Sequence, residues 1–265
     1  KKGFKALFKY KDGKIELDVH AAKDREAITR LNKLPSDIRG CPMIYEVPIE
    51  NAPKGLYKIG YDPVRQDEGT SLAAIIVYKG VHVNGFQHSV IVAEYVGRLQ
   101  ITEDIDALAL QFAEYYNTTV MFENEIPAFK NYARRKKKLH LVAMQPDTVI
   151  SKNVKKSKTA RVYGCHMNIQ LKDAGERYVK DWLLSELDYD ENGDPITVID
   201  RIYSIRLLEE LIYYSRKGNF DLVSALFMCM FQVQETTLDK TYHTDPNKKT
   251  KMEMLMEFYD NKLYK

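Results

Sequence analysis

Residues 56 to 62 read Leu-Tyr-Lys-Ile-Gly-Tyr-Asp, and this stretch decides the expected fold. Its alternating pattern stops at a turn-forming Asp-Pro pair, which is typical of a strand. Residues 71 to 78, rich in Ala, Ile and Val, and residues 88 to 96 are two further strand candidates. Three strands joined by short turns predict an antiparallel meander, so the main domain is expected to begin near residue 55.

The pattern changes period after the third strand. Apolar residues recur at helical spacing from residue 105 to residue 116, and Thr102 is placed to act as the N-cap of this helix. An apolar strand is expected at residues 119 to 123, a helix at 128 to 138 and a further apolar strand at 139 to 144. Strands that alternate with helices in this way predict right-handed crossovers and parallel pairing.

This order of elements predicts the α/β fold of the ribonuclease H-like class. The expected sheet is mixed, with three antiparallel strands followed by two parallel strands, and helices flank it. Later helices are expected at residues 172–187, 204–216 and 220–234. The main domain is therefore expected to span residues 55–235.

The two ends of the chain are expected to lie outside this domain. Residues 4 to 20 alternate around Lys11-Asp12-Gly13, which predicts an N-terminal β-ribbon. Residues 24 to 34 are weakly helical in pattern, and the prolines that follow resist regular structure. We expect residues 1–54 to be an appendage or linker region and residues 236–265 to be a C-terminal helical tail.

Composition excludes several classes of protein. The chain has 265 residues, of which 45% are hydrophobic, enough for a sizeable core. Cys41, Cys165 and Cys229 are far apart, which predicts neither a disulfide framework nor a zinc cluster. No apolar run approaches the ~18 to 20 residues of a membrane span, so no membrane partner is expected. The sequence also contains no Gly-x-x-x-x-Gly-Lys-Ser/Thr loop for nucleotide hydrolysis.

Charge is concentrated in one stretch of the chain. The formal net charge of +3 does not by itself predict a partner, but residues 130–161 contain 11 Lys or Arg and the single acid Asp147. Such a window is more typical of a surface that binds a polyanion than of a solvated helix end. The residues expected to contact a DNA backbone are Arg134, Arg135, Lys136, Lys137, Lys138, Lys152, Lys155, Lys156, Lys158 and Arg161.

Three acids stand where the predicted fold would bring them together. Asp62 ends the first strand, Glu123 ends the fourth, and Asp221 starts a late helix. The first and fourth strands are neighbours in that fold, so two of these carboxylates are expected side by side. Each acid also has a structural interpretation, as a turn residue, a helix cap or a first-turn acid. An unpaired charge against a core is costly, however, and a bound divalent cation would remove that cost.

Five strings, in their order and spacing, resemble the nuclease domain of the terminase large subunits of tailed bacteriophages and related viruses. They are Tyr57-Lys-Ile-Gly-Tyr-Asp-Pro63, Ala93-Glu-Tyr-Val-Gly-Arg98, Val120-Met-Phe-Glu-Asn124, Leu207-Leu-Glu-Glu-Leu211 and Asn219-Phe-Asp-Leu-Val-Ser-Ala225. The similarity runs from about residue 56 to residue 234. It implies that Asp62, Glu123 and Asp221 are catalytic, metal-binding acids, and that Glu68 or Asp67 assists a second metal.

The sequence departs from this family at two places. After Glu123 it reads Asn-Glu-Ile-Pro, where relatives often have a glycine-containing turn. Phe220 stands where many relatives carry a second acid or a His. Either departure would weaken or move one metal.

The resemblance implies hydrolysis by two Mg²⁺ or Mn²⁺ ions, about 3.5 to 4 Å apart, of which one activates water and one holds the leaving oxygen. Asp62 would bridge the ions, and Glu123 and Asp221 would each hold one. The implied protein is an endonuclease that cuts double-stranded DNA during viral genome packaging, in the cytoplasm of the infected host cell. Its implied partners are an ATPase domain in the full-length protein, a small terminase subunit and a portal.

Two alternatives remain from the sequence. The first is another nuclease of the same fold, such as a junction resolvase or a transposase-like enzyme. The second is a non-catalytic DNA-binding assembly module, in which the three acids merely cap helices and turns. A preformed carboxylate site would be stabilised by added metal, which separates the second alternative from the other two.

Overall fold

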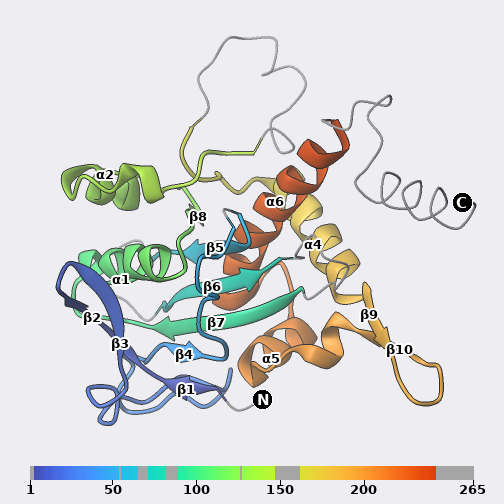
Figure 1. Ribbon diagram of the computed structural model, residues 1–265, viewed down its shortest axis with the longest axis horizontal. Helices are drawn as coiled ribbons and strands as arrows, with labels where there is room; N and C mark the ends of the chain where they lie inside the picture. The colour runs from blue at the N-terminus through green and yellow to red at the C-terminus, as the bar shows by residue number, and fades with distance from the viewer. Residues whose placement is uncertain are drawn as a thin grey trace, which may run out of the picture.

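The computed structural model describes residues 3–53, 55–64, 71–80, 89–125, 127–146 and 162–242, with the backbone alone for residues 235–242. Figure 1 shows a central sheet with α1 and α2 on one side and α4, α5 and α6 on the other. The described elements are β1 (Phe4–Lys5), β2 (Leu7–Lys11), β3 (Lys14–Asp18), β4 (Met43–Ile44), β5 (Tyr57–Asp62), β6 (Ala73–Lys79), β7 (Val90–Gly97), α1 (Thr102–Tyr115), β8 (Val120–Phe122), α2 (Ala128–Arg135), the 3-10 helix η1 (Leu139–Leu141), α4 (Ile169–Leu183), β9 (Glu186–Tyr189), β10 (Pro195–Thr197), the 3-10 helix η3 (Val198–Arg201), α5 (Ile205–Tyr213) and α6 (Asp221–Tyr242).

The main sheet is mixed, and in the described residues it has six strands in the order β1-β4-β7-β6-β5-β8. Strands β5, β6 and β7 form an antiparallel meander, and β8 joins β5 in parallel. A mixed sheet flanked by helices is consistent with the ribonuclease H-like class. The short strands β1 and β4 extend the sheet beyond β7, and β2 pairs with β3 as a separate hairpin. The division of the chain at residue 54 stays a prediction.

The strand expected at residues 139–144 is wrong in extent. Leu139–Leu141 form η1, and beyond it isolated bridges join Val142 to Val120 in parallel and Met144 to Tyr163 in antiparallel. Lys137 has a left-handed backbone (φ 59), so the chain is still turning when it reaches residue 139. The second parallel strand is therefore reduced to a bridge beside β8.

The ends of several helices also differ from expectation. Thr102 is the first residue of α1 and not its cap, and Ile101 holds the cap position without a side-chain hydrogen bond. Residues 24 to 34 form no helix. Helix α6 continues past residue 234 to Tyr242, and residues 243–265 of the expected helical tail lie outside the described residues.

Both faces of the sheet are buried. In β6, Ala73, Ile75 and Val77 belong to the core shared with α1 and α2. Their neighbours Ala74, Ile76 and Tyr78 belong to the core shared with α4 and α6. Because successive side chains of a strand point to opposite faces, this double burial explains a continuous apolar run.

Gly60 lets α6 lie directly on β5. A Cβ at residue 60 would stand 1.8 Å from the Ala225 carbonyl oxygen and 2.8 Å from the Cys229 nitrogen. The Gln232 side-chain amide donates to the Ile59 carbonyl at 2.7 Å, which fastens the same contact further along. This close approach sets where the first residue of α6, Asp221, stands relative to the end of β5.

The three cysteines, which all fall in described segments, are buried free thiols. Among the described helices, none has both the length and the hydropathy to cross a bilayer.

Candidate functional site

The register of two neighbouring strands brings Asp62 and Glu123 together. Tyr61 pairs with Phe122 across the parallel strands, and the Glu123 N–H donates to the Tyr61 carbonyl at 3.1 Å. Asp62 and Glu123 are the next residues of the two chains, so they are neighbours at the same end of the sheet. Tyr61 and Phe122 face α1 and α2, so by alternation both acids are directed to the face that α6 covers.

Asp62, Glu123 and Asp221 line one cavity of about 430 Å³. They come from β5, from the residue after β8 and from the start of α6, which are far apart in the sequence. Asp62 and Glu123 are partly exposed, and Asp221 is buried. The three acids thus border the same cavity, while their catalytic role stays a prediction.

The same cavity holds residues to which the sequence analysis gave no role. Arg98, Lys172 and Arg216 bring positive charge to the lining, and Glu125 adds an acid. Arg98 is buried and donates to the Ser71 carbonyl at 2.5 Å. Its position directly after the fully buried strand β7 is the one feature of the sequence that could have marked Arg98 as a site residue, because a buried charge there must find partners.

Phe220, at one of the two places where the sequence departs from the pattern it resembles, lines this cavity too. Its ring packs against Tyr214, with centroids 5.6 Å apart. An apolar ring therefore forms part of the cavity wall beside Asp221.

A smaller hollow of about 40 Å³ lies on the other side of the two strand-end acids. Asp62 and Glu123 line it together with Asp106 of α1. Tyr61 donates its hydroxyl to Asp106 at 2.8 Å, and burial raises the pKa of Asp106 to about 6 although this hydrogen bond opposes the shift. Carboxyl groups therefore surround the end of β5 on both faces of the sheet.

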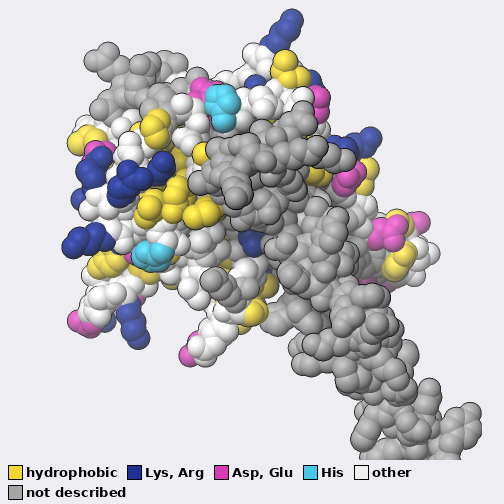
Figure 2. All heavy atoms as spheres, turned by 90° about the horizontal axis from the view of Figure 1, so that it is seen from above, with side chains coloured by type: hydrophobic (Ala, Val, Ile, Leu, Met, Phe, Trp, Pro, Cys, Tyr) yellow, Lys and Arg dark blue, Asp and Glu magenta, His cyan; other side chains and the backbone are white. Residues whose placement is uncertain are grey.

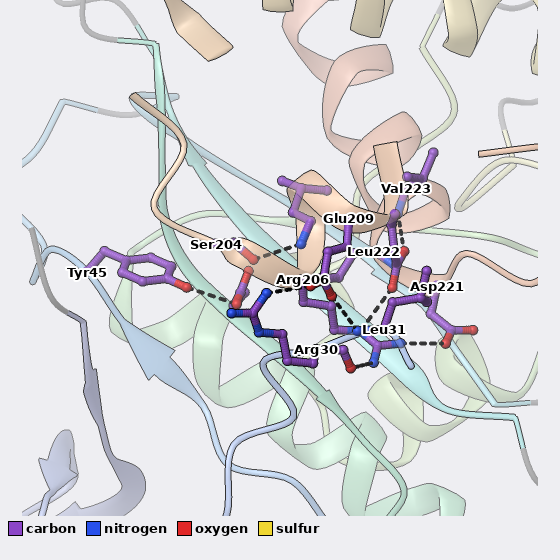
Figure 3. Close-up of polar contacts among 12 residues, drawn as sticks. Arg30, Leu31, Tyr45, Ser204, Arg206, Glu209, Asp221, Leu222 and Val223 are labelled. Carbon is purple, nitrogen blue, oxygen red and sulfur yellow. Dashed lines mark hydrogen bonds and ion pairs between the residues drawn. The ribbon is translucent and has the colours of Figure 1, made fainter. Parts of the chain in front are cut away.

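Asp221 is held by an arginine inside the protein (Figure 3). The Arg206 guanidinium lies 3.7 Å from the Asp221 carboxylate and donates to Glu210 at 2.9 Å. Burial raises the pKa of Asp221 to about 6 and that of Glu210 to about 7, although Arg206 acts against both shifts. Desolvation thus outweighs the attraction of the arginine at both carboxyl groups.

Glu210 also fastens the start of α6. Its carboxylate accepts the backbone N–H groups of Leu222 at 2.8 Å and Val223 at 3.2 Å. The first N–H groups of a helix have no partner within the helix, and a carboxylate satisfies them while matching the positive end of the helix dipole. One side chain of α5 therefore fixes the turn of α6 that carries Asp221.

The donor chemistry of the cavity fits a divalent cation, since Mg²⁺ and Mn²⁺ prefer carboxylate oxygens. Within the described ranges, however, no group of three or more His, Cys, Asp or Glu is arranged so that it could hold a metal ion. One oxygen of the Asp221 carboxylate lies 3.7 Å from the Arg206 guanidinium. Asp67 and Glu68, the acids expected to assist a second metal, lie outside the described residues. The described part of the site is a set of carboxylates around a cavity and not a preformed cluster.

The basic stretch is partly described. Arg134, Arg135, Lys136 and Lys137 are exposed at the end of α2 and just beyond it. Arg135 forms an ion pair with Glu103, and Lys138 forms one with Glu114 at 2.6 Å. Figure 2 looks onto the end of the molecule that carries α2 and shows Lys and Arg side chains grouped on one side of it. The other expected DNA contacts lie outside the described residues: Lys152, Lys155, Lys156, Lys158 and Arg161.

No family model matches the chain, and no curated protein matches it in sequence. Among solved structures it is similar to the large terminase nuclease from thermophilic phage G20c, with 9% sequence identity and a TM-score of 0.34. The similarity covers 77% of this chain and 92% of that chain. At this TM-score it carries no conclusion about the family or the activity of this chain, which rest on its own residues.

Proposed function

We propose that the chain is a metal-dependent endonuclease domain of the terminase large-subunit type, which cuts double-stranded DNA. The observation that carries this proposal is the cavity shared by Asp62, Glu123 and Asp221. Two of these acids are neighbours through strand register, and the third reaches the cavity through the close packing of α6 on Gly60. The five strings that resemble terminase nucleases include all three acids.

Each acid has a part in the proposed reaction. Bound Mg²⁺ or Mn²⁺ would activate a water and stabilise the leaving oxygen of the phosphodiester. Asp62 would be shared between ions, and Glu123 and Asp221 would each hold one, with Asp67 or Glu68 as a further ligand. Lys172, a half-buried cation in the cavity lining, would attract the phosphate backbone.

The biological setting belongs to the same proposal. Packaging of a viral genome in the cytoplasm of an infected host cell would require an ATPase domain in the full-length protein. A small terminase subunit and a portal would be its further partners. The resemblance of the strings supports this setting.

Asp62→Asn tests the site. We expect Mn²⁺-dependent cutting of plasmid DNA to fall below detection, because the amide removes the charge shared between ions, while thermal unfolding stays close to that of the wild type. Asp104→Asn, which changes an exposed acid in the first turn of α1, should cut normally. Undiminished cutting by Asp62→Asn would refute the site.

Neutralising the exposed end of α2 tests the DNA contact. The double variant Arg134→Gln/Lys137→Gln should bind DNA more weakly and reduce the slope of log K against log salt concentration, by about 0.9 for each phosphate that the protein no longer neutralises. Lys11→Gln/Lys14→Gln, at the exposed turn of the β2–β3 hairpin, is the control for general loss of charge. An equal slope in the two double variants would make the α2 residues a solvated surface.

A non-catalytic DNA-binding assembly module is the second candidate. It is favoured by the ion pair that occupies Asp221 and by the lack of a metal-ready group among the described side chains. Thermal unfolding during a Mn²⁺ titration separates the candidates, since bound ligand stabilises by about 2.7 kcal/mol at 100 times its Kd. A nuclease site should be stabilised, and Asp62→Asn should lose the effect.

A junction resolvase or transposase-like nuclease would instead be recognised by a preference for branched over linear duplex DNA.

A further inference from the structure

The segment around Arg30 lies against α5. The Arg30 guanidinium donates to Glu209 at 2.6 Å, and the Leu31 N–H donates to the other oxygen of the same carboxylate at 2.8 Å. Both oxygens of Glu209 are therefore engaged by two consecutive residues of one segment (Figure 3). A backbone N–H and a side chain held by one carboxylate fix the position of the segment along the helix.

The same segment also contacts the arginine that holds Asp221. Arg206 donates from Nη1 to the Arg30 carbonyl at 2.8 Å and from Nε to Glu210 at 2.9 Å, and its Nη2 lies 3.7 Å from Asp221. A guanidinium is planar, so its donors keep fixed directions relative to one another. The Arg30 carbonyl therefore helps to set the direction in which Arg206 meets Asp221. Arg206 and Glu209 are three residues apart on α5, a spacing that places them on neighbouring positions of the helix surface.

We infer that Glu209 and Arg206 are positioning residues. Through them, the contact of the segment Arg30-Leu31 (the N-terminal segment) with α5 controls the position of Asp221. The inference rests on the proposed function, because it takes Asp221 as a metal-binding acid. When the segment leaves its seat, Arg206 loses the carbonyl that orients it. Arg206 then no longer holds Glu210 and Asp221 in fixed positions. Because Glu210 accepts the first N–H groups of α6, the first turn of that helix becomes more mobile. The N-terminal segment thereby regulates the affinity of the site for metal.

The chain offers a matched control for Glu209. The pair Lys9–Asp18 resembles Arg30–Glu209 in side-chain exposure, at 47% and 25% against 51% and 24%. Asp18 also accepts a backbone N–H, from Ala21 at 2.9 Å, as Glu209 does from Leu31. Asp18 lies in the β2–β3 hairpin and lines neither cavity beside the acids. Removal of Glu209 and removal of Asp18 therefore each break a partly exposed ion pair and one hydrogen bond to a backbone N–H. Only the removal of Glu209 also frees the N-terminal segment from α5.

The test compares Glu209→Ala with Asp18→Ala. Mn²⁺ alone is titrated by calorimetry. Loss of a group that contacts a metal ligand directly weakens binding about 10- to 100-fold, and we expect about 10-fold for Glu209→Ala, which acts on Asp221 through Arg30 and Arg206. The kcat for DNA cutting should fall by a similar factor, with KM unchanged. Amide hydrogen exchange at Leu222 and Val223, whose N–H groups are held by Glu210, should become faster. Asp18→Ala should match the wild type in all three measurements.

Two further variants keep the test decisive. Glu209→Gln retains an oxygen that can accept the Leu31 N–H, so it should recover part of the lost Mn²⁺ affinity. Arg206→Lys keeps the charge beside Glu210 and Asp221, but a single ammonium does not reproduce three fixed directions. We expect it to fold and to bind Mn²⁺ as weakly as Glu209→Ala.

The outcomes separate this inference from the proposed function. If Glu209→Ala equals Asp18→Ala in Mn²⁺ affinity and in amide exchange, the coupling is overturned even when the wild type cuts DNA. If the wild type neither binds Mn²⁺ nor cuts DNA, the proposed function fails. The amide exchange then decides alone, since faster exchange at Leu222 and Val223 in Glu209→Ala supports the coupling and equal exchange overturns it.

Discussion

Two arginines each hold two carboxylates, Arg216 in the lining of the larger cavity and Arg206 behind the lining residue Asp221, and they differ in burial. Arg206 holds Glu210 and Asp221 with a side chain that is 3% exposed. Arg216 holds Asp173 at 2.5 Å and Glu176 at 2.6 Å with a side chain that is 48% exposed. Asp221 and Arg216 line the same cavity, so the two clusters belong to one site.

The pKa shifts of the two clusters run in opposite directions. The hydrogen bond from Arg216 lowers the pKa of Glu176, because this half-buried carboxylate remains partly hydrated and gains a cation. Burial raises the pKa of Glu210 and Asp221 although Arg206 is beside them. The arginine thus outweighs desolvation at Glu176, and desolvation outweighs the arginine at Glu210 and Asp221. In the buried cluster, each charge depends on its partner for solvation.

Arg206→Gln breaks the buried cluster and should have the largest effect. It leaves Glu210 and Asp221 buried without a cation, and loss of one partner of a buried ion pair costs about 3 to 5 kcal/mol. Urea denaturation at neutral pH measures the loss of unfolding free energy. A cost below about 1 kcal/mol would mean that water enters the cluster and that burial does not separate it from Arg216.

Asp106 sharpens the comparison, because it is a buried carboxyl whose hydrogen-bond partner is the Tyr61 hydroxyl and not an arginine. Burial raises its pKa from 3.8 to about 6, so the protonated form favours the folded state. This contribution is complete below the unfolded pKa and is lost as the pH rises through about 6. A tenfold change in a proton-binding constant corresponds to about 1.4 kcal/mol, so stability should fall by on the order of 2 to 3 kcal/mol across this window.

Asp106→Asn tests that pH dependence. The amide oxygen still accepts from the Tyr61 hydroxyl and does not ionise, so the fall in stability between pH 4 and pH 7 should be smaller than in the wild type by about the amount given above. Urea denaturation at a series of pH values gives both curves. Parallel curves for the two proteins would show that Asp106 is solvated in the folded protein.

Local pattern was sufficient to predict the strand-end acids. Alternation ended β5 at Asp62, an apolar run ended β8 before Glu123, and the neighbouring position of these strands follows from the order of elements. Asp221 was visible as an acid that opens an apolar helix. The pattern did not show that these acids share a cavity. That depends on the close packing of α6 on β5, which is possible because Gly60 has no side chain.

Residues that act through tertiary partners were not predictable in the same way. Arg206 and Glu210 are four apart on α5, and this spacing is equally typical of a solvated pair on a helix surface. Arg206 is covered by the backbone at Arg30, in residues 24 to 34, whose weakly helical pattern gave the wrong prediction because the segment forms no helix. The two-residue strands β1 and β4 are likewise too short to show alternation. Such contacts come from packing between distant segments and leave no local trace.

The smallest effect is expected from Arg216→Gln, which breaks the exposed cluster. Asp173 and Glu176 regain water when the guanidinium is lost, and Glu176 keeps the Tyr214 hydroxyl as a donor at 3.1 Å. The urea midpoint should stay close to that of the wild type, and the small difference should disappear at 1 M salt, where the Debye length is about 3 Å. The loss caused by Arg206→Gln should persist at that salt concentration, because buried charges are screened far less. If both variants lose the same stability and respond equally to salt, burial is not the property that divides the two clusters, and Asp221 would be as freely solvated as Glu176.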